Sequence, residues 1–357
     1  MRIYFAPMQG VTGWPYRLTH LKHYDGIDRY YMPFISVHQS RSMKGGEKRD
    51  LQPDHNVSGR MVPQLLPGGA EDSLAYMEQI LDAGYDEVSL NFGCPARTVT
   101  TKGKGAGILE TPDKLDEYLE HLFTGMTGRL AGLKVSVKTR IGMNDCSAAS
   151  ELIRIYNRYP IAEVQVHARL GKDAYDGVTD KETFRMFYEE IRHPVCYNGD
   201  IRSLEDFQNL KEEFPDLAAV MIGRGLVADP MLAEKIQQEM QQRDAEQGDV
   251  KPDDAPLGCV QHENTKADRQ QEEKKRLILF HDDVCNAWHE CYGQEHPAIC
   301  RMLEIWDYLG ASFPGCERKV RKIRKARNLQ TYRQLAGEVL MQEYHPGKWH
   351  GKYPVGH

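Results

Sequence analysis

The chain lacks a long apolar run: no stretch approaches the roughly 20 consecutive apolar residues that a membrane-spanning helix needs. Its first residues, Met1–Pro7, lead directly into a strand-like run, without the charged and apolar regions of a signal peptide. We therefore expect a cytoplasmic protein without membrane contact.

Cysteine is scarce, with eight residues in 357, and no two cysteines form a CxxC pair. Their irregular spacing excludes a disulfide framework and fits reduced thiols. A C-terminal group of cysteines and histidines has spacings that match no compact zinc pattern, so that we expect no metal. This group consists of Cys285, Cys291, Cys300, Cys316, His281, His289 and His296.

The chain also lacks an overall positive charge, because its net charge is -6. This value excludes a generally basic coat for nucleic acid but leaves room for a local basic patch. No Gly-x-Gly-x-x-Gly motif follows the first predicted strand, as it would in a doubly wound dinucleotide-binding sheet.

What the sequence does contain is an alternation of strand-like and helix-like runs. Eight such units predict an α/β fold, a closed (β/α)8 TIM barrel, over residues 1–240. The predicted strands are Ile3–Pro7, Tyr30–Ser36, Met61–Leu66, Glu87–Asn91, Lys134–Arg140, Glu163–His167, Val195–Asn198 and Ala219–Gly223.

Beyond the barrel, residues 241–276 are polar and show little apolar periodicity, which predicts a linker or insertion. Helical spacing then returns and predicts a small all-α helical bundle at 277–345. Its expected helices are Leu277–Cys291, Ala298–Leu309, Arg318–Arg327 and Tyr332–Leu340.

The third of these helices carries seven cations against one local acid, Glu317. This density favours phosphate binding, and the alternative is a solvated basic face. The cations are Arg318, Lys319, Arg321, Lys322, Arg324, Lys325 and Arg327.

Functional residues of a TIM barrel lie at the C-terminal ends of its strands. Polar residues recur at nearly every predicted strand end here. Each alone has an ordinary explanation as a turn, a loop, a solvated charge or a core histidine, but their coincidence on one face predicts a site. They are Gln9, Gln64, Asn91, Lys138, Arg140, His167, Arg169, Asn198, Asp200 and Arg224.

Cys94 is the strongest candidate for chemistry, in the run Asn91-Phe92-Gly93-Cys94-Pro95. Gly93 permits a tight turn, and Pro95 removes an amide hydrogen that would need a hydrogen-bond acceptor. We therefore expect the turn to hold the thiol in a defined direction rather than to bury it. The alternative is a packed structural thiol.

The residue types at the strand ends also indicate a ligand. Gly199, Gly223 and Gly225, with Arg224, follow strands seven and eight, where barrels frequently bind a phosphate. Gln64 and Lys138 suit a planar heterocycle rich in acceptors. Flavin mononucleotide (FMN) combines one such ring with one phosphate.

The motifs, taken in order across residues 1 to about 235, resemble those of the tRNA-dihydrouridine synthase family. The resemblance implies an oxidoreductase that uses FMN and NADPH to reduce the C5–C6 bond of selected uridines in tRNA, with Cys94 donating a proton to C5. The motifs are Ala6-Pro7-Met8, Gln64, Asn91-Phe92-Gly93-Cys94-Pro95, Lys104-Gly105-Ala106-Gly107-Ile108-Leu109, Lys138-Thr139-Arg140, His167-Ala168-Arg169, Asn198-Gly199-Asp200 and Gly223-Arg224-Gly225.

The resemblance further implies roles for individual residues. Asn91 would hold the uracil, and Arg140 and Arg169 would contact substrate phosphate or uracil oxygens. The cation density of the third C-terminal helix adds Arg321, Lys322, Arg324 and Lys325 as expected tRNA contacts, and no obligate protein partner is expected. FMN would be lined by Pro7, Met8, Gln9, Gln64, Lys138, His167, Asn198, Gly199, Asp200, Gly223 and Arg224.

Two other functions compete with this hypothesis. An FMN barrel enzyme acting on a free pyrimidine, such as a relative of dihydroorotate dehydrogenase, would not explain the basic helix. A non-catalytic RNA-binding protein would not explain Cys94 and Lys138. The sequence leaves open the tRNA position, the choice between NADPH and NADH, and the oligomeric state.

Overall fold

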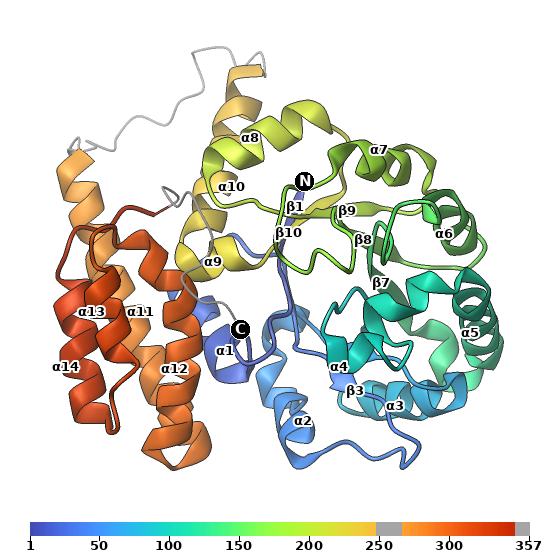
Figure 1. The fold of residues 1–357 in the computed structure, drawn as a ribbon, viewed down its shortest axis with the longest axis horizontal. Helices are drawn as coiled ribbons and strands as arrows, with labels where there is room; N and C mark the ends of the chain where they lie inside the picture. The colour runs from blue at the N-terminus through green and yellow to red at the C-terminus, as the bar shows by residue number, and fades with distance from the viewer. Residues whose placement is uncertain (248–265, 347–357) are drawn as a thin grey trace, which may run out of the picture. The chain divides into compact units, whose positions relative to one another are not determined.

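A computed structural model describes residues 1–247 and 266–346 of the chain (Figure 1). These residues form two compact units. The first unit consists of residues 1–14, 27–201 and 208–223, and the second of residues 15–26, 202–207 and those from 224 onward. Within the described ranges, no helix is long and apolar enough to cross a membrane.

All eight predicted strand segments are confirmed in the first unit, and every strand pair is parallel. Two segments are each divided by a proline, Pro33 or Pro63, which has no N–H to give to the ladder. The strands are β1 (Arg2–Phe5), β2 (Arg29–Tyr31), β3 (Ile35–Ser36), β4 (Met61–Val62), β5 (Gln64–Leu66), β6 (Glu87–Phe92), β7 (Lys134–Arg140), β8 (Glu163–His167), β9 (Val195–Asn198) and β10 (Ala219–Ile222).

The pairing of the strands closes the sheet into a barrel. Its order is β3-β5-β6-β7-β8-β9-β10-β1-β2-β4. The strands β2 and β3 belong to one segment, and β4 and β5 belong to the next. These two segments pair at both ends of the order, through Tyr30 with Met61 and through Ile35 with Leu65. The predicted (β/α)8 barrel is therefore confirmed.

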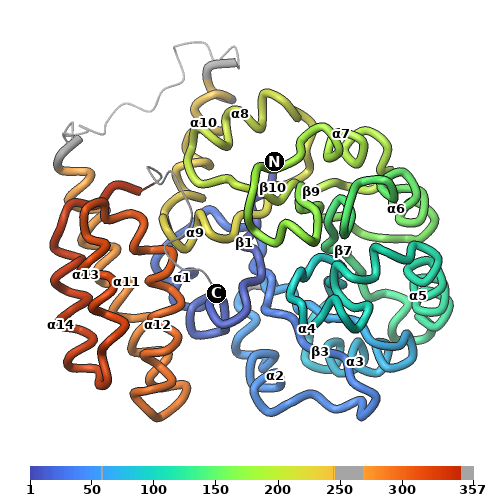
Figure 2. The backbone as a smooth tube through the Cα atoms, viewed as in Figure 1, coloured from blue at the N-terminus to red at the C-terminus, as the bar shows by residue number. Residues whose placement is uncertain are grey.

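Helices surround the barrel, and the chain passes from each strand outward to a covering segment and back (Figures 1 and 2). Helix α5 buries Leu115, Leu119 and Leu122, a stripe with the spacing of one helix face. Burying each leucine contributes about 1.5–3 kcal/mol. The helical elements of this unit are α2 (Gly45–Asp50), η1 (Pro53–His55), η2 (Val57–Gly59), α3 (Ala70–Asp82), α4 (Arg97–Thr100), η3 (Gly105–Glu110), α5 (Pro112–Gly125), η4 (Gly128–Gly132), α6 (Ala149–Tyr156) and α7 (Lys181–Glu190).

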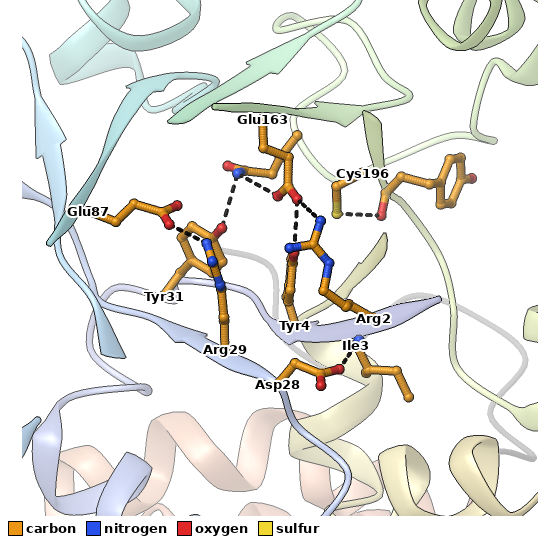
Figure 3. Close-up of polar contacts among 11 residues, drawn as sticks. Arg2, Ile3, Tyr4, Asp28, Arg29, Tyr31, Glu87, Glu163 and Cys196 are labelled. Carbon is orange, nitrogen blue, oxygen red and sulfur yellow. Dashed lines mark hydrogen bonds and ion pairs between the residues drawn. The ribbon is translucent and has the colours of Figure 1, made fainter. Parts of the chain in front are cut away.

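A buried polar network lies near the N-terminal ends of the strands (Figure 3). Glu163 accepts hydrogen bonds from Nη2 of Arg2 and from the hydroxyl of Tyr4, each at 2.8 Å. Glu87 pairs with Arg29. Because buried carboxylates need such partners and this end of a TIM barrel serves stability, we assign the network to the fold rather than to a site.

The remaining helices belong wholly or partly to the second unit. They are α1 (Trp14–His23), α8 (Leu204–Glu213), α9 (Arg224–Ala228), α10 (Leu232–Gln247), α11 (Lys266–Tyr292), α12 (Glu295–Leu309), η6 (Gly310–Ser312), α13 (Glu317–Ile323) and α14 (Leu329–Leu340). Helices α1 and α8 have residues in both units.

The four predicted C-terminal helices are present, with different ends. Helix α13 ends at Ile323 instead of Arg327, because Asn328 caps α14 by accepting a hydrogen bond from the amide of Thr331 at 2.8 Å. Of the expected linker at 241–276, residues 241–247 end α10 and residues 266–276 begin α11. Residues 248–265 lie outside the described residues.

His281, one of the histidines near the C-terminal cysteines, is part of a buried core network. The hydroxyl of Tyr332 accepts a hydrogen bond from Nε1 of Trp306 at 2.9 Å and lies 2.7 Å from Nε2 of His281. This network joins α11, α12 and α14. Among the residues that the structure describes, no group of three or more His, Cys, Asp or Glu is arranged to hold a metal ion.

Candidate active site

The strand ends bring most of the predicted site residues to one face of the barrel. In the strand register, Asn91 lies beside Lys138, and His167 lies between Arg140 and Asn198. The others follow in chain order: Pro7, Met8 and Gln9 after β1, Gln64 at the start of β5, Cys94 after β6, Arg169 after β8, Gly199 and Asp200 after β9, and Gly223 after β10.

The side chain of Asn91 folds the turn that carries Cys94. Its Oδ1 accepts hydrogen bonds from the amides of Gly93 at 3.0 Å and Cys94 at 2.8 Å. Its Nδ2 donates to Oε1 of Gln64 at 2.7 Å, and Gln64 in turn donates to the hydroxyl of Ser89 at 3.2 Å. These bonds fix the turn that carries the thiol, and within the described residues they use one of the two Nδ2 hydrogens of Asn91.

Arg140 holds the same turn from the neighbouring strand. Its Nε donates to the carbonyl of Gly93 and its Nη1 to that of Leu170, each at 2.8 Å. The residue is 1% exposed, and in the described ranges its side chain pairs with no carboxylate. Burial lowers the pKa of Arg140 to about 10. A buried guanidinium bonded only to carbonyls favours a ligand rich in acceptors.

The surroundings of Cys94 keep its thiol protonated. Partial burial raises the pKa of Cys94 above its usual value. A hydrogen bond involving the backbone of Ala96, and the charges of Arg140 and Lys138, oppose this shift without reversing it. At neutral pH the group is therefore a thiol that can donate a proton.

Lys138 is a cation held in a defined position. Its Nζ donates to Oδ1 of Asn198 at 2.9 Å, and Nδ2 of Asn198 donates to the carbonyl of Met221 at 2.8 Å. Burial, together with repulsion from Arg140, lowers the pKa of Lys138 to about 8. The ammonium therefore loses its proton more readily than an exposed lysine does.

The donors of Arg169 are largely occupied within the protein. This buried guanidinium pairs with Asp200 and donates to the carbonyls of Asp176 at 3.0 Å and Gly177 at 2.8 Å. Its Nη1 also lies 3.3 Å from Nε2 of His167. The geometry favours a positioning role, in which Arg169 fixes the loop after β8.

Tyr175 in this loop lies beside two of the proposed site residues, and it was not among the residues predicted from the sequence. Its ring lies over Arg140, with 5.5 Å between the guanidinium carbon and the ring centroid, and the residue is 56% exposed. The ring centroids of Tyr175 and His167 are 6.2 Å apart. An exposed aromatic at the edge of a site is suited to stack on a base. The sequence shows the tyrosine but not its exposure.

Two glycines of the expected phosphate loops lie against neighbouring side chains, Gly199 more tightly than Gly223. A Cβ on Gly223 would lie 3.3 Å from that of Ala6 and 3.4 Å from Sδ of Met8. One on Gly199 would lie 2.8 Å from the hydroxyl of Tyr197. Gln9 is exposed, and Arg224 begins α9 in the second unit.

The four predicted tRNA contacts of the helical unit are exposed. Arg324 pairs with Asp307. Arg321 donates only to the backbone carbonyl of Glu317, at 3.2 Å. Within the described part of the chain, Arg321, Lys322 and Lys325 have no acidic partner, so that no carboxylate neutralises these three charges.

The sequence profile of the dihydrouridine synthase family matches residues 4–296. The tRNA-dihydrouridine(16) synthase of Ralstonia nicotianae is 29% identical over 87% of this chain and 94% of that protein. The enzyme of the same name from Neisseria meningitidis serogroup B is 31% identical over 66% and 71%. The tRNA-dihydrouridine synthase B of Pasteurella multocida is 27% identical over 65% and 67%.

Among solved structures, morphinone reductase in complex with tetrahydroNAD aligns with 67% of this chain and 86% of that chain. The TM-score is 0.49 at 10% sequence identity, a likeness too weak to bear on function.

Proposed function

The chain belongs to the dihydrouridine synthase family and is a tRNA-dihydrouridine synthase, an oxidoreductase, and on that premise we propose three further properties. The protein binds FMN, NADPH reduces the bound FMN, and the enzyme reduces uridine 16 of tRNA in the cytoplasm. The observation that carries the proposal is the combination, on one barrel face, of a protonated thiol at Cys94 and an oriented cation at Lys138. The proposed position is supported by the names of the relatives from Ralstonia and Neisseria, which are tRNA-dihydrouridine(16) synthases.

The residues present fit FMN. Lys138, oriented by Asn198, would face the N1–C2 carbonyl edge of the ring, where a cation stabilises negative charge. Gly199, Asp200, Gly223 and Arg224 would hold the phosphate, with the two glycines keeping their loops free of side chains. When bound, FMN supplies the hydride for C6 of uracil. The remaining proposed contacts are Pro7, Met8, Gln9, Gln64 and His167.

The protein's own part in the reaction is binding and proton transfer. The free Nδ2 hydrogen of Asn91 and the guanidinium of Arg140 would bind the uracil oxygens. Cys94 would donate its proton to C5, and the charges of Arg140 and Lys138 would stabilise the thiolate that remains until solvent reprotonates it. Arg169 would act mainly by fixing the loop that carries Tyr175.

A folded tRNA must extrude the uridine to reach this site, at a cost of a few kcal/mol. Contacts to the RNA backbone must offset that cost, and we propose that Arg321, Lys322 and Lys325 provide part of them. A free-pyrimidine enzyme would need no such cations. The family match and the arrangement of Cys94 and Lys138 disfavour both competing functions.

The test of the cofactor uses Lys138→Met. We expect purified wild-type protein to be yellow, and the variant to bind FMN more weakly because it lacks the cation at the ring edge. The FMN affinity of the wild-type apoprotein should fall as the pH rises through about 8, where Lys138 loses its charge. The FMN affinity of the variant should not change in this pH range. Fluorescence titration with FMN across pH measures both effects.

Lys134→Met is the matched control, because Lys134 lies at the opposite end of the same strand and is exposed. Its FMN affinity should equal that of the wild type at every pH. A wild-type protein that is colourless and ignores added FMN would rule out the proposed cofactor.

A further inference from the structure

A cationic platform follows the Cys94 turn, and we define it as residues 95–107, which include α4 and the start of η3. From residue 93 to residue 109 the sequence contains no Asp or Glu. It contains Arg97, Lys102 and Lys104. The stretch beside the proposed proton donor is therefore wholly positive.

Glycine packing fixes the platform against the thiol turn. Gly105 has a φ of +55°, and a Cβ there would lie 2.7 Å from the carbonyl oxygen of Cys94. A Cβ on Gly107 would lie 2.5 Å from the carbonyl oxygen of Thr100. The amide of Ala106 donates to the carbonyl of Cys94 at 3.0 Å. Only glycine fits at both positions, so that the platform holds a set place beside the thiol.

The three cations differ in their surroundings. Nζ of Lys104 donates to the carbonyl of Val37 at 3.2 Å, and burial and the charge of Lys102 lower the pKa of Lys104. Lys104 thereby fastens the platform to the segment after β3. Arg97 and Lys102 are exposed, and neither pairs with an acid in the ranges 1–247 and 266–346. Unpaired like charges on a fixed scaffold favour an anionic ligand.

We propose that Arg97 and Lys102 bind the RNA phosphates that flank the reduced uridine, an inference that rests on the proposed function. Arg97 is three residues beyond Cys94, so that their Cα atoms are at most about 11 Å apart. A uridine whose C5 meets the thiol brings its own backbone to this side of the barrel. Phosphate contacts position a nucleic acid on a protein without recognising its base sequence. At this site they hold the uracil over the thiol.

The test compares tRNA binding across a salt series for wild type and for Arg97→Gln/Lys102→Gln. Loss of two phosphate contacts should lower the slope of log affinity against log salt by roughly 1.4–1.8. Affinity at physiological salt should fall by roughly 10- to 30-fold. Ethylation of the phosphates next to uridine 16 should weaken binding to the wild type but not to the variant.

Two control variants isolate the platform. Arg192→Gln/Lys211→Gln removes two cations that have no acidic partner in the described part of the chain and that lie in segments leading into β9 and β10, at the opposite barrel end. This variant should keep the wild-type slope. Arg97→Lys/Lys102→Arg retains both charges and should restore most of the affinity.

The outcomes separate the inference from the proposed function. If the wild type forms dihydrouridine and the Gln variant keeps its slope, the platform does not bind RNA and only this inference is overturned. The inference also fails if the variant instead raises the KM for NADPH, because the platform would then hold the phosphates of the dinucleotide. A wild type that neither binds tRNA nor forms dihydrouridine contradicts the proposed function itself.

Discussion

Cys94→Ala is expected to slow the reduction of tRNA by about 10²–10⁴-fold, the usual contribution of a positioned general acid. In the proposed mechanism the side chain would donate its proton after the base is bound, so that affinity for FMN and tRNA should change little. Reduction of the flavin by NADPH should proceed at the wild-type rate, because that step needs no proton from the thiol. Stopped-flow absorbance under anaerobic conditions follows both half-reactions separately.

The matched control is Cys146→Ala, at an exposed cysteine in the loop after β7. It should leave both half-reactions unchanged. Because the pKa of Cys94 is raised, the wild-type tRNA step should also be constant across the neutral pH range. If reduced Cys94→Ala protein were reoxidised by tRNA at the wild-type rate, Cys94 would be a structural thiol.

The second large effect is expected from Arg321→Gln/Lys322→Gln/Lys325→Gln in the helical unit. Arg324 is left in place because it is already paired with Asp307. Loss of three phosphate contacts should lower the log–log salt slope by up to about 2.7 and weaken tRNA binding by roughly 50- to 150-fold at physiological salt. The change should appear in the KM for tRNA and not in the rate at saturation.

A triple Gln variant at Lys134, Arg192 and Lys211 removes the same charge from the N-terminal end of the barrel. Filter binding across a salt series should give this control the slope of the wild type. Equal slopes for the helical variant and the control would mean that the basic residues are only a solvated face, and the RNA surface would have to be sought elsewhere.

The barrel was predictable because its signals are local. Each strand is an apolar run of a few residues between turn signals. Eight such strands alternating with helices are compatible with few topologies other than a closed barrel. The prolines at 33 and 63 were visible in the sequence. Whether each of them divides a strand, however, depends on whether its backbone nitrogen faces a neighbouring strand in the sheet. The end of α13 was missed because the cap at Asn328 competes with a favourable helical pattern.

The positions of the proposed site residues at the strand ends could be predicted from the sequence, but their contacts could not. The strand pattern places Asn91, Gln64 and Arg169 in or directly after strands of the barrel, as the structure has them. No spacing rule shows that Asn91 holds two amides of the cysteine turn, or that Arg169 is engaged by Asp200. Such bonds join residues far apart in the chain, and so does the contact of Tyr175 with Arg140.

The central claim is that this chain reduces uridine 16 of tRNA, and position-resolved mapping of dihydrouridine tests it most directly. The map compares tRNA from a strain lacking the gene with tRNA from that strain carrying either the wild-type gene or Cys94→Ala. We predict that dihydrouridine at position 16 is absent without the gene, returns with the wild type and does not return with Cys94→Ala. Dihydrouridine retained at position 16 in the strain lacking the gene would contradict the account.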